Sequence, residues 1–212
     1  MSIPPDRRTR KRQATRQGIS DAATRLFLEH GFDHVTVDQI AAAADVGRMT
    51  VFNHFPRKED MLFDRDEEGR ALLRDAILET DAGVKPVESL RRLMHRLIDG
   101  DTPYARFTPA SARFIATVEA SEALKARARQ IRGELEDVVA TAMLERAGLA
   151  DADPVARLAA GMAVAALTVA LVAAHRLYKE GHDSDAAGSL FLALVDRGCG
   201  GVEAALAGTA YA

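Results

Sequence analysis

The chain has 212 residues, of which 48% are apolar and 28% charged, and its formal net charge is −3. These values are ordinary for a soluble globular protein, and they exclude a disordered chain or one that is basic throughout. A single cysteine excludes an internal disulfide, and the basic N-terminus is not followed by the apolar segment of a signal peptide, so we expect a cytoplasmic protein.

Charge is distributed unevenly along the chain. The first 16 residues contain six Arg or Lys and one Asp, whereas the residues after position 60 contain 18 basic and 23 acidic side chains. Residues 1–11, which include Pro4 and Pro5, are expected to form a flexible basic arm. A polyanion would therefore approach the N-terminal end, where this arm is either a solvated tail or a nonspecific phosphate contact.

The N-terminal third predicts three helices. The first covers about 14–30, because its apolar residues recur at i, i+3, i+4, i+7 and i+8: Ile19, Ala22, Ala23, Leu26 and Phe27. Thr36 and Gln39 form the pattern of a capping box, which begins a short helix over about 37–44. The third helix covers about 48–55 and ends at Pro56.

Longer helices follow, so the predicted fold class is all-α. They are expected at 58–79, 86–99, 109–119, 122–147, 154–181 and 186–207, separated by Gly- and Pro-containing breaks. Residues 158–174 carry no charge, but at 17 residues, mostly small ones, this stretch is short for a membrane span. We expect it to lie in a protein core or a dimer interface.

Residues 36–55 have the pattern of a helix-turn-helix. Ile40, Ala41, Val46, Val51 and Phe55 are expected to face inward, against Leu26, Phe27 and Val35. Polar or flexible side chains remain on the outer face of the third helix, which has the dimensions to enter a DNA major groove.

Here the sequence resembles the TetR family of bacterial regulators. The resemblance rests on Arg16-x-x-Ile19-x-x-Ala22-Ala23-x-x-Leu26-Phe27, on Gly31-Phe32, on Thr36-Val37-x-x-Ile40-Ala41-x-x-Ala44 and on T-V-F-N-H-F-P-R-K-E-D-M-L over 50–62. It implies a three-helix DNA-binding domain over 12–72 and a larger all-helical effector-binding and dimerisation domain over 73–212.

The resemblance also implies roles for individual residues. Arg48, Met49 and Asn53 would contact bases; Thr36, Thr50, Phe52, His54 and Lys58 would contact phosphates. Four members of the phosphate set have a simpler alternative: Thr36 as a helix cap, Phe52 as a core residue, His54 as packing against the first helix, and Lys58 as a solvated charge.

The sequence departs from the family pattern in three places. Phe52 stands where the family usually has Tyr, which removes a hydroxyl. Asp45 replaces a common Gly in the turn, and Asp enters the left-handed region more readily than most residues. Gly47 replaces a Ser-type N-cap.

For the C-terminal body, the resemblance implies a homodimer through the last two helices and a pocket for a small-molecule effector. Candidate pocket residues are His95, Phe107, Arg113, Phe114 and Met143, each with a core or surface role as the alternative. Arg113 would hold an anionic effector.

No enzymatic or metal-binding motif is apparent, so we expect neither catalysis nor a cofactor. The acidic loop 180–185 is expected to cap the last helix rather than to bind a metal. The predicted function is a sequence-specific transcriptional regulator, a repressor released from a palindromic operator by an effector. The alternative is a helical dimer that binds a small molecule or a protein and carries a vestigial DNA-binding domain.

Overall fold

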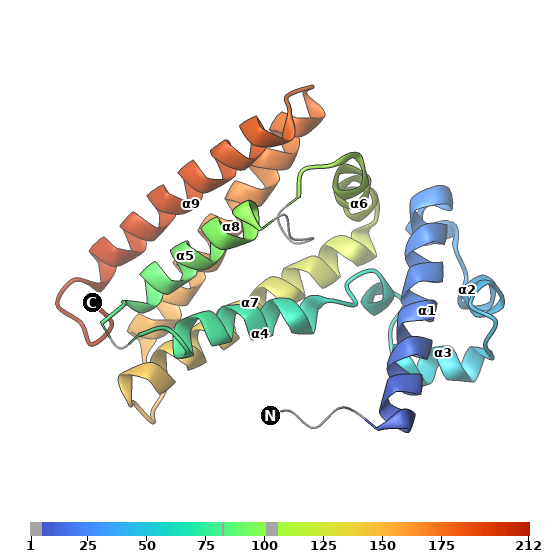
Figure 1. The fold of residues 1–212 in the computed structure, drawn as a ribbon, viewed down its shortest axis with the longest axis horizontal. Helices are drawn as coiled ribbons and strands as arrows, with labels where there is room; N and C mark the ends of the chain where they lie inside the picture. The colour runs from blue at the N-terminus through green and yellow to red at the C-terminus, as the bar shows by residue number, and fades with distance from the viewer. Residues whose placement is uncertain (1–5, 82, 101–105) are drawn as a thin grey trace. The chain divides into compact units, whose positions relative to one another are not determined.

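The computed structural model describes residues 6–81, 83–100 and 106–212, and within them every regular element is a helix (Figure 1). This confirms the all-α prediction. The α-helices are α1 (Arg7–His30), α2 (Val37–Ala43), α3 (Arg48–His54), α4 (Asp66–Leu78), α5 (Pro86–Asp99), α6 (Pro109–Ala120), α7 (Glu122–Ala147), α8 (Pro154–Lys179) and α9 (Ser184–Leu206). Two short 3-10 helices, η1 (Phe32–His34) and η2 (Glu59–Met61), interrupt the first third.

The described chain divides into two compact units. The first consists of the residues up to Arg65 together with Ala116–Arg127, and the second of Asp66–Ile115 and Ala128–Ala212. The expected boundary was residue 72, so the first unit ends earlier than expected. It also gains a segment from the α6–α7 junction, which the sequence did not suggest.

The first unit is built around α1. Ile19, Ala23 and Phe27 are fully buried on its inner face, as its apolar spacing predicts, and Phe27 packs on Phe32 with ring centroids 4.9 Å apart. From α2, α3 and the residue after α3 come three further core side chains: Ile40, Val51 and Phe55. Two of the side chains expected inside, Leu26 and Val46, are only half-buried.

The segment from α6 and α7 is anchored in this unit by three contacts. Leu124 is fully buried. The Ser121 hydroxyl donates to Asp33 in η1 at 2.9 Å, and the Arg127 guanidinium donates to Asp60 in η2, also at 2.9 Å. The segment therefore contacts the two 3-10 helices that precede and follow the α2–α3 pair in the chain.

The start of α1 corrects the expectation of a flexible arm. Residues 7–11 are helical, so α1 begins at Arg7 and not near Ala14; residues 1–5 of the expected arm lie outside the described residues. The cause is the Asp6 side chain, which accepts a hydrogen bond from the Thr9 amide at 2.7 Å and caps the helix. This hydrogen bond lowers the pKa of the Asp6 carboxyl.

The helix expected over 58–79 is wrong in its first part. Residues 58–65 form η2 and turns, and α4 begins only at Asp66. Three consecutive acidic residues open α4, where the helix dipole favours negative charge: Asp66, Glu67 and Glu68. Before it, Asp64 accepts a hydrogen bond from the buried Ser20 hydroxyl at 2.5 Å, which holds the turn against α1.

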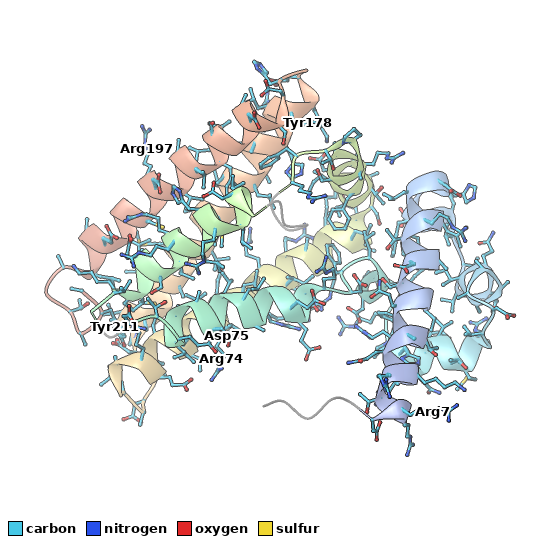
Figure 2. All side chains as sticks on the ribbon, viewed as in Figure 1. Arg7, Arg74, Asp75, Tyr178, Arg197 and Tyr211 are labelled. Atoms are coloured by element: carbon cyan, nitrogen blue, oxygen red, sulfur yellow. The ribbon has the colours of Figure 1, made fainter. Side chains whose placement is uncertain are left out.

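In the second unit, α8 and α9 pack closely against each other. A methyl group added at Gly198 would lie 2.4 Å from the Cβ of Ala166, a distance that side chains do not adopt. Small residues on α8 are buried in this unit: Ala156, Ala159, Ala160, Ala163, Ala170 and Ala174. Tyr211 lies near the C-terminus (Figure 2). Its hydroxyl donates to Asp153, the N-cap of α8, at 2.7 Å. Burial and this carboxylate raise the pKa of Tyr211 to about 12.

Within the described residues, one helix is long enough and apolar enough to cross a membrane, judged by length and composition alone. This helix is α8, whose most apolar window has a mean hydropathy of 2.1. A third of the residues in its most apolar window are buried. Helices in the core of a soluble protein have the same composition, and the buried alanines above give α8 that role within its unit.

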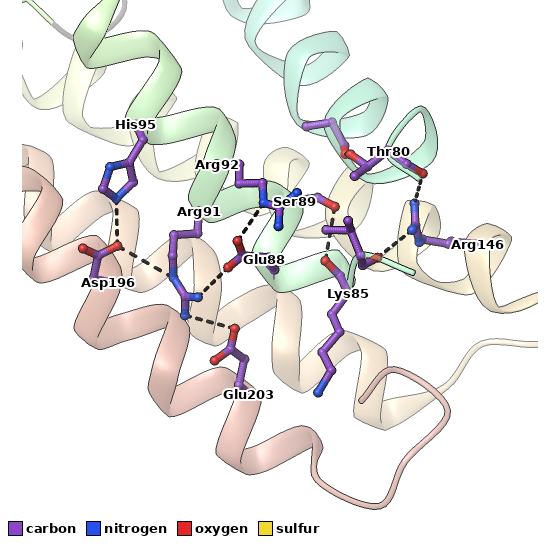
Figure 3. A network of polar contacts seen from close by, with 12 residues as sticks. Thr80, Lys85, Glu88, Ser89, Arg91, Arg92, His95, Arg146, Asp196 and Glu203 are labelled. Atoms are coloured by element: carbon purple, nitrogen blue, oxygen red, sulfur yellow. Dashed lines mark hydrogen bonds and ion pairs between the residues drawn. The ribbon is translucent and has the colours of Figure 1, made fainter. Parts of the chain in front are cut away.

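A polar network joins α5 to α9 (Figure 3). The Arg91 guanidinium contacts Glu88 on its own helix at 2.5 Å and Glu203 on α9 at 3.0 Å. His95 contacts Asp196 on α9 at 2.9 Å. On α7, the Arg146 guanidinium donates to four backbone carbonyls at and after the end of α4: Ile77, Thr80, Asp81 and Val84. The contact with Ile77 satisfies a carbonyl that the end of α4 leaves unpaired, and the other three hold the turn between α4 and α5.

The α8–α9 contact predicts opposite effects for one chemical change at two sites. Gly133→Ala in α7 meets no atom within 4 Å, so we expect it to stabilise the protein by up to about 1 kcal/mol through helix propensity. Gly198→Ala should destabilise it, because the new methyl clashes with Ala166. Thermal unfolding of both variants measures this, and equal stabilisation would rule out the close approach of α8 and α9.

Candidate nucleic-acid interface

The α2–α3 pair has the geometry of a helix-turn-helix. Thr36 and Gln39 form the expected capping box: the Gln39 amide donates to Oγ1 of Thr36, and the Thr36 amide donates to Oε1 of Gln39 at 2.8 Å. Asp45 occupies the left-handed region with φ 52°, which places the turn as its residue type predicts. Gly47 is the N-cap of α3 and gives it no side-chain hydrogen bond.

The outer face of α3 presents the three residues expected to read bases. Met49 is 71% exposed, and Arg48 and Asn53 are also exposed. The Arg48 guanidinium is not free, because one of its nitrogens donates to both carboxylate oxygens of Asp38 on α2, at 3.1 and 2.8 Å. Phe52 is 38% exposed and lies 5.6 Å from the Arg48 guanidinium, which places it on the surface rather than in the core.

The residues expected to contact phosphates have different surroundings. Thr36 serves as a helix cap, whereas Thr50 is half-buried on α3. The Lys58 ammonium donates to the carbonyls of Phe32 and Val35 at 2.8 and 2.9 Å and lies 4.0 Å from the Phe32 ring. Two of its three donors are thus used inside the protein, and burial lowers its pKa.

Arg16 connects α1 to the end of α3, a role that sequence reasoning missed. Its guanidinium donates to the His54 carbonyl at 2.6 Å and lies 4.1 Å from the centre of the Phe55 ring. Arg16 thereby satisfies one of the carbonyls that the end of α3 leaves unpaired. The position belongs to the quoted family pattern, but its spacing alone gave no sign of this contact.

Between α1 and α3 runs a groove of about 550 Å³. Its lining consists of Arg8, Thr9, Lys11, Arg12, Thr15, Thr50 and His54. Two of these residues, Thr50 and His54, were expected to contact phosphates, and the other five come from the first turns of α1. The lining contains three cations, two of which fall in the segment expected to be a flexible arm, and no carboxylate.

His54 titrates in this basic environment. Partial burial and the positive charges of Arg12 and Arg16 lower its pKa below the usual 6.5. At neutral pH the imidazole is therefore mostly neutral, and a nearby anion would favour its protonated form.

The five candidate effector residues lie in different environments. Phe107 is buried, packs on His175 with ring centroids 4.9 Å apart, and lines a cavity of about 370 Å³ between α5 and α9. His95 contacts Asp196 as part of the α5–α9 network, and Met143 is in the core. Arg113 is exposed and Phe114 half-buried. None of these four is among the residues that line that cavity: Ile98, Asp99, Arg106, Phe107, Ser184, Asp185, Gly188, Ser189 and Leu192.

Residues 19–64 match the family described as bacterial regulatory proteins, tetR family. This match covers α2, α3 and the second half of α1, elements whose geometry is given above. The match confirms the resemblance to the TetR family over this segment of the chain.

The relatives named here are transcriptional regulators, as expected for a chain with this motif. The regulator TcmR of Streptomyces glaucescens is 33% identical over 101 residues, 46% of this chain and 45% of TcmR. The repressor LfrR of Mycolicibacterium smegmatis is 35% identical over 89 residues, 42% of this chain and 46% of LfrR. The matched segments thus span less than half the length of either relative.

Solved structures are similar over most of the chain. SmeT, the repressor of the Stenotrophomonas maltophilia multidrug efflux pump SmeDEF, is 26% identical with a TM-score of 0.55, covering 90% of this chain and 91% of SmeT. NalD of Pseudomonas aeruginosa is 23% identical with a TM-score of 0.56, covering 88% of this chain and 97% of NalD, and it supports the fold alone. The all-helical TetR fold therefore extends through the second unit.

The pKa of His54 provides a test of the groove. We expect an imidazole pKa below 6.5, raised by Arg12→Ala because a nearby positive charge is removed, and unchanged by Arg25→Ala on the same helix. Histidine ring protons followed by NMR measure it, with His54→Gln assigning the signal. The pKa of His54 is lower in the folded protein than in the unfolded chain, so the unfolded chain takes up the proton at a higher pH. The free energy of unfolding therefore decreases as the pH falls from 6.5 through the pKa of the folded protein. A His54 pKa that is the same in the wild type and in Arg12→Ala would contradict the placement of Arg12 beside His54.

Proposed function

We propose that this protein is a cytoplasmic transcriptional repressor that binds a palindromic DNA operator as a homodimer and is released by a small-molecule effector. The observation that carries the proposal is the outer face of α3, where Arg48, Met49 and Asn53 are all exposed on a helix held from below by a buried core. TetR family regulators bind DNA operators and small molecules and act as dimers, and several named relatives are repressors.

In this proposal α3 lies in the major groove. Arg48 leaves Asp38 and donates in a fork to guanine O6 and N7, Asn53 pairs with adenine, and Met49 packs on a thymine methyl. All three come from one helical face, so a single insertion brings them to adjacent base pairs.

The phosphate contacts fix the position of α3 on the duplex. Thr50 and His54 line the basic groove and are well placed for this role, and Thr36 at the N-terminus of α2 offers a second position. Lys58 retains one donor for a phosphate, whereas Phe52 contributes only apolar contact to the backbone.

Dimerisation is supported by an apolar stripe on α8. Leu158, Val169 and Val172 are 58%, 60% and 52% exposed and share one helical face. Small or flexible side chains are likewise exposed on one face of α9, including Ala193 and Arg197, the latter projecting outward in Figure 2. A second copy of the chain would cover these faces as a four-helix bundle, and two copies of α3 would then read a two-fold operator.

The effector is proposed to bind in the second unit. The cavity between α5 and α9 is one place for it, because Phe107 and Leu192 give it an apolar side and Asp99, Arg106 and Asp185 a charged one. Its volume of about 370 Å³ is within the range of small-molecule sites.

Base reading is tested with labelled DNA selected from random sequences by the wild-type protein. Arg48→Ala/Asn53→Ala should lose the preference for this duplex over a scrambled one, at a cost of about 1–3 kcal/mol for each bidentate contact. Arg25→Ala, an exposed arginine on α1, serves as the control and should keep the preference. Equal binding of wild type and double variant to every duplex would support the alternative of a helical dimer with a vestigial DNA-binding domain.

The proposed dimer interface is tested by placing negative charges on the exposed apolar face of α8. Val169→Glu/Val172→Glu should reduce the mass in solution, measured by light scattering after gel filtration, from two chains to one chain of 22.9 kDa. The reason is that burying two unpaired carboxylates in an apolar interface costs several kcal/mol. Leu149→Glu, at an exposed apolar residue between α7 and α8, should leave the dimer intact. If the double variant remains dimeric, the dimer interface does not include this face of α8.

A further inference from the structure

We propose that one face of the first turns of α1 forms, together with the end of α3, a rigid cradle for DNA backbone phosphates outside the major-groove contact. The α1 residues of this phosphate cradle are Arg8, Lys11, Arg12 and Thr15, and the α3 residues are Thr50 and His54. The inference rests on the proposed DNA binding and assigns it a second contact surface.

Helical spacing places the α1 residues on one face. Arg8, Arg12 and Thr15 follow one another at i, i+4 and i+7, and Lys11 lies at i+3. Arg7 and Arg10 belong to the same two turns but point elsewhere, and neither lines the groove. The helix thus separates five basic residues into a groove set of three and an outer set of two.

The charges of the groove select an anion. In the described part of the chain, no ion pair involves Arg8, Lys11 or Arg12, and no carboxylate lines the groove. Three uncompensated cations and the Thr50 hydroxyl are donors that suit a phosphodiester, whereas the Thr15 hydroxyl already donates to the Lys11 carbonyl at 3.0 Å. His54 adds a ring that can take up a proton once a phosphate offsets the charges of Arg12 and Arg16.

The cradle is fixed at both ends. The Asp6 cap holds the first turn of α1 in helical form, and Arg16 ties α1 to the His54 carbonyl at 2.6 Å. Because α1 is ordered before DNA arrives, its cations lose less entropy on binding than the same residues in a flexible arm would. The groove opens beside α3 itself, so an occupant belongs to the backbone that flanks the bases contacted by α3.

Two double variants that remove the same charge from the same turns test the proposal. Arg8→Ala/Arg12→Ala removes two of the three cradle cations and leaves Lys11, and Arg7→Ala/Arg10→Ala removes the two outer arginines. Each is titrated with the labelled duplex selected by the wild type and with a scrambled duplex of equal length, over a series of salt concentrations. Circular dichroism checks that both variants keep the helix content of the wild type.

We expect the cradle variant to bind both duplexes more weakly, to keep the preference between them, and to lower the salt dependence by about one unit of slope for each lost phosphate contact. Ethylation interference should show, at the same time, the loss of backbone positions at the flank of the footprint. The outer variant should retain those positions and most of the salt slope. Arg8→Lys/Arg12→Lys should restore binding, since the charge is retained.

The outcomes separate the inference from the proposed function. Equal losses in the two double variants, with an unchanged footprint, would overturn the cradle while leaving sequence-specific binding in place. A changed base preference in the cradle variant would also overturn it, because α1 would then be reading a groove and not the backbone. A wild type that selects no sequence would overturn the proposed function first.

Discussion

The contact between Arg16 and the end of α3 determines how the DNA-binding unit presents its surface. A helix of seven residues has most of its backbone groups at its termini, so α3 depends on its surroundings for stability. Arg16 supplies a donor to the His54 carbonyl and stacks on Phe55, whose ring is fully buried in the core. The same guanidinium therefore fixes the end of α3 against α1.

The same surface explains why three positive charges lie together at no evident electrostatic benefit to the folded chain. Like charges on adjacent turns of a helix repel one another by a few tenths of a kcal/mol for each pair. A single carboxylate, Asp6, opens α1, and it is used for capping. Such a cluster is retained most easily where an external anion offsets it, and the same positive charge contributes, after burial, to the lowered pKa of His54. The cost to stability falls on the free protein and disappears in the complex.

Much of the first unit could be predicted from the sequence, because its signals are local. The spacing from Ile19 to Phe27, the capping box at Thr36 and the left-handed Asp45 each depend on residues within one or two turns. What could not be predicted depends on distant partners: Lys58 turning back to the carbonyls of Phe32 and Val35, and Ser121 reaching Asp33. The early start of α1 is an intermediate case, since the Asp6 cap is local but two prolines and the basic run suggested disorder. The candidate effector residues were predicted from residue type alone, and residue type does not determine which side chains line the same cavity.

The ion pair between Arg48 and Asp38 bears on the base contacts proposed for α3. In the free protein the guanidinium already has two acceptor oxygens, so guanine must replace a carboxylate and not water. The net gain at a cognate base is consequently smaller than for an unpaired arginine, because the pair with Asp38 is given up. At a wrong base Arg48 can keep Asp38, so no donor is left unsatisfied in the groove and the usual penalty for a mismatch is reduced. Arg48 is on the other hand held close to its working position, which lowers the entropy lost on binding. Asp38, which touches no base in this arrangement, thus becomes a determinant of how sharply the operator is distinguished from other DNA.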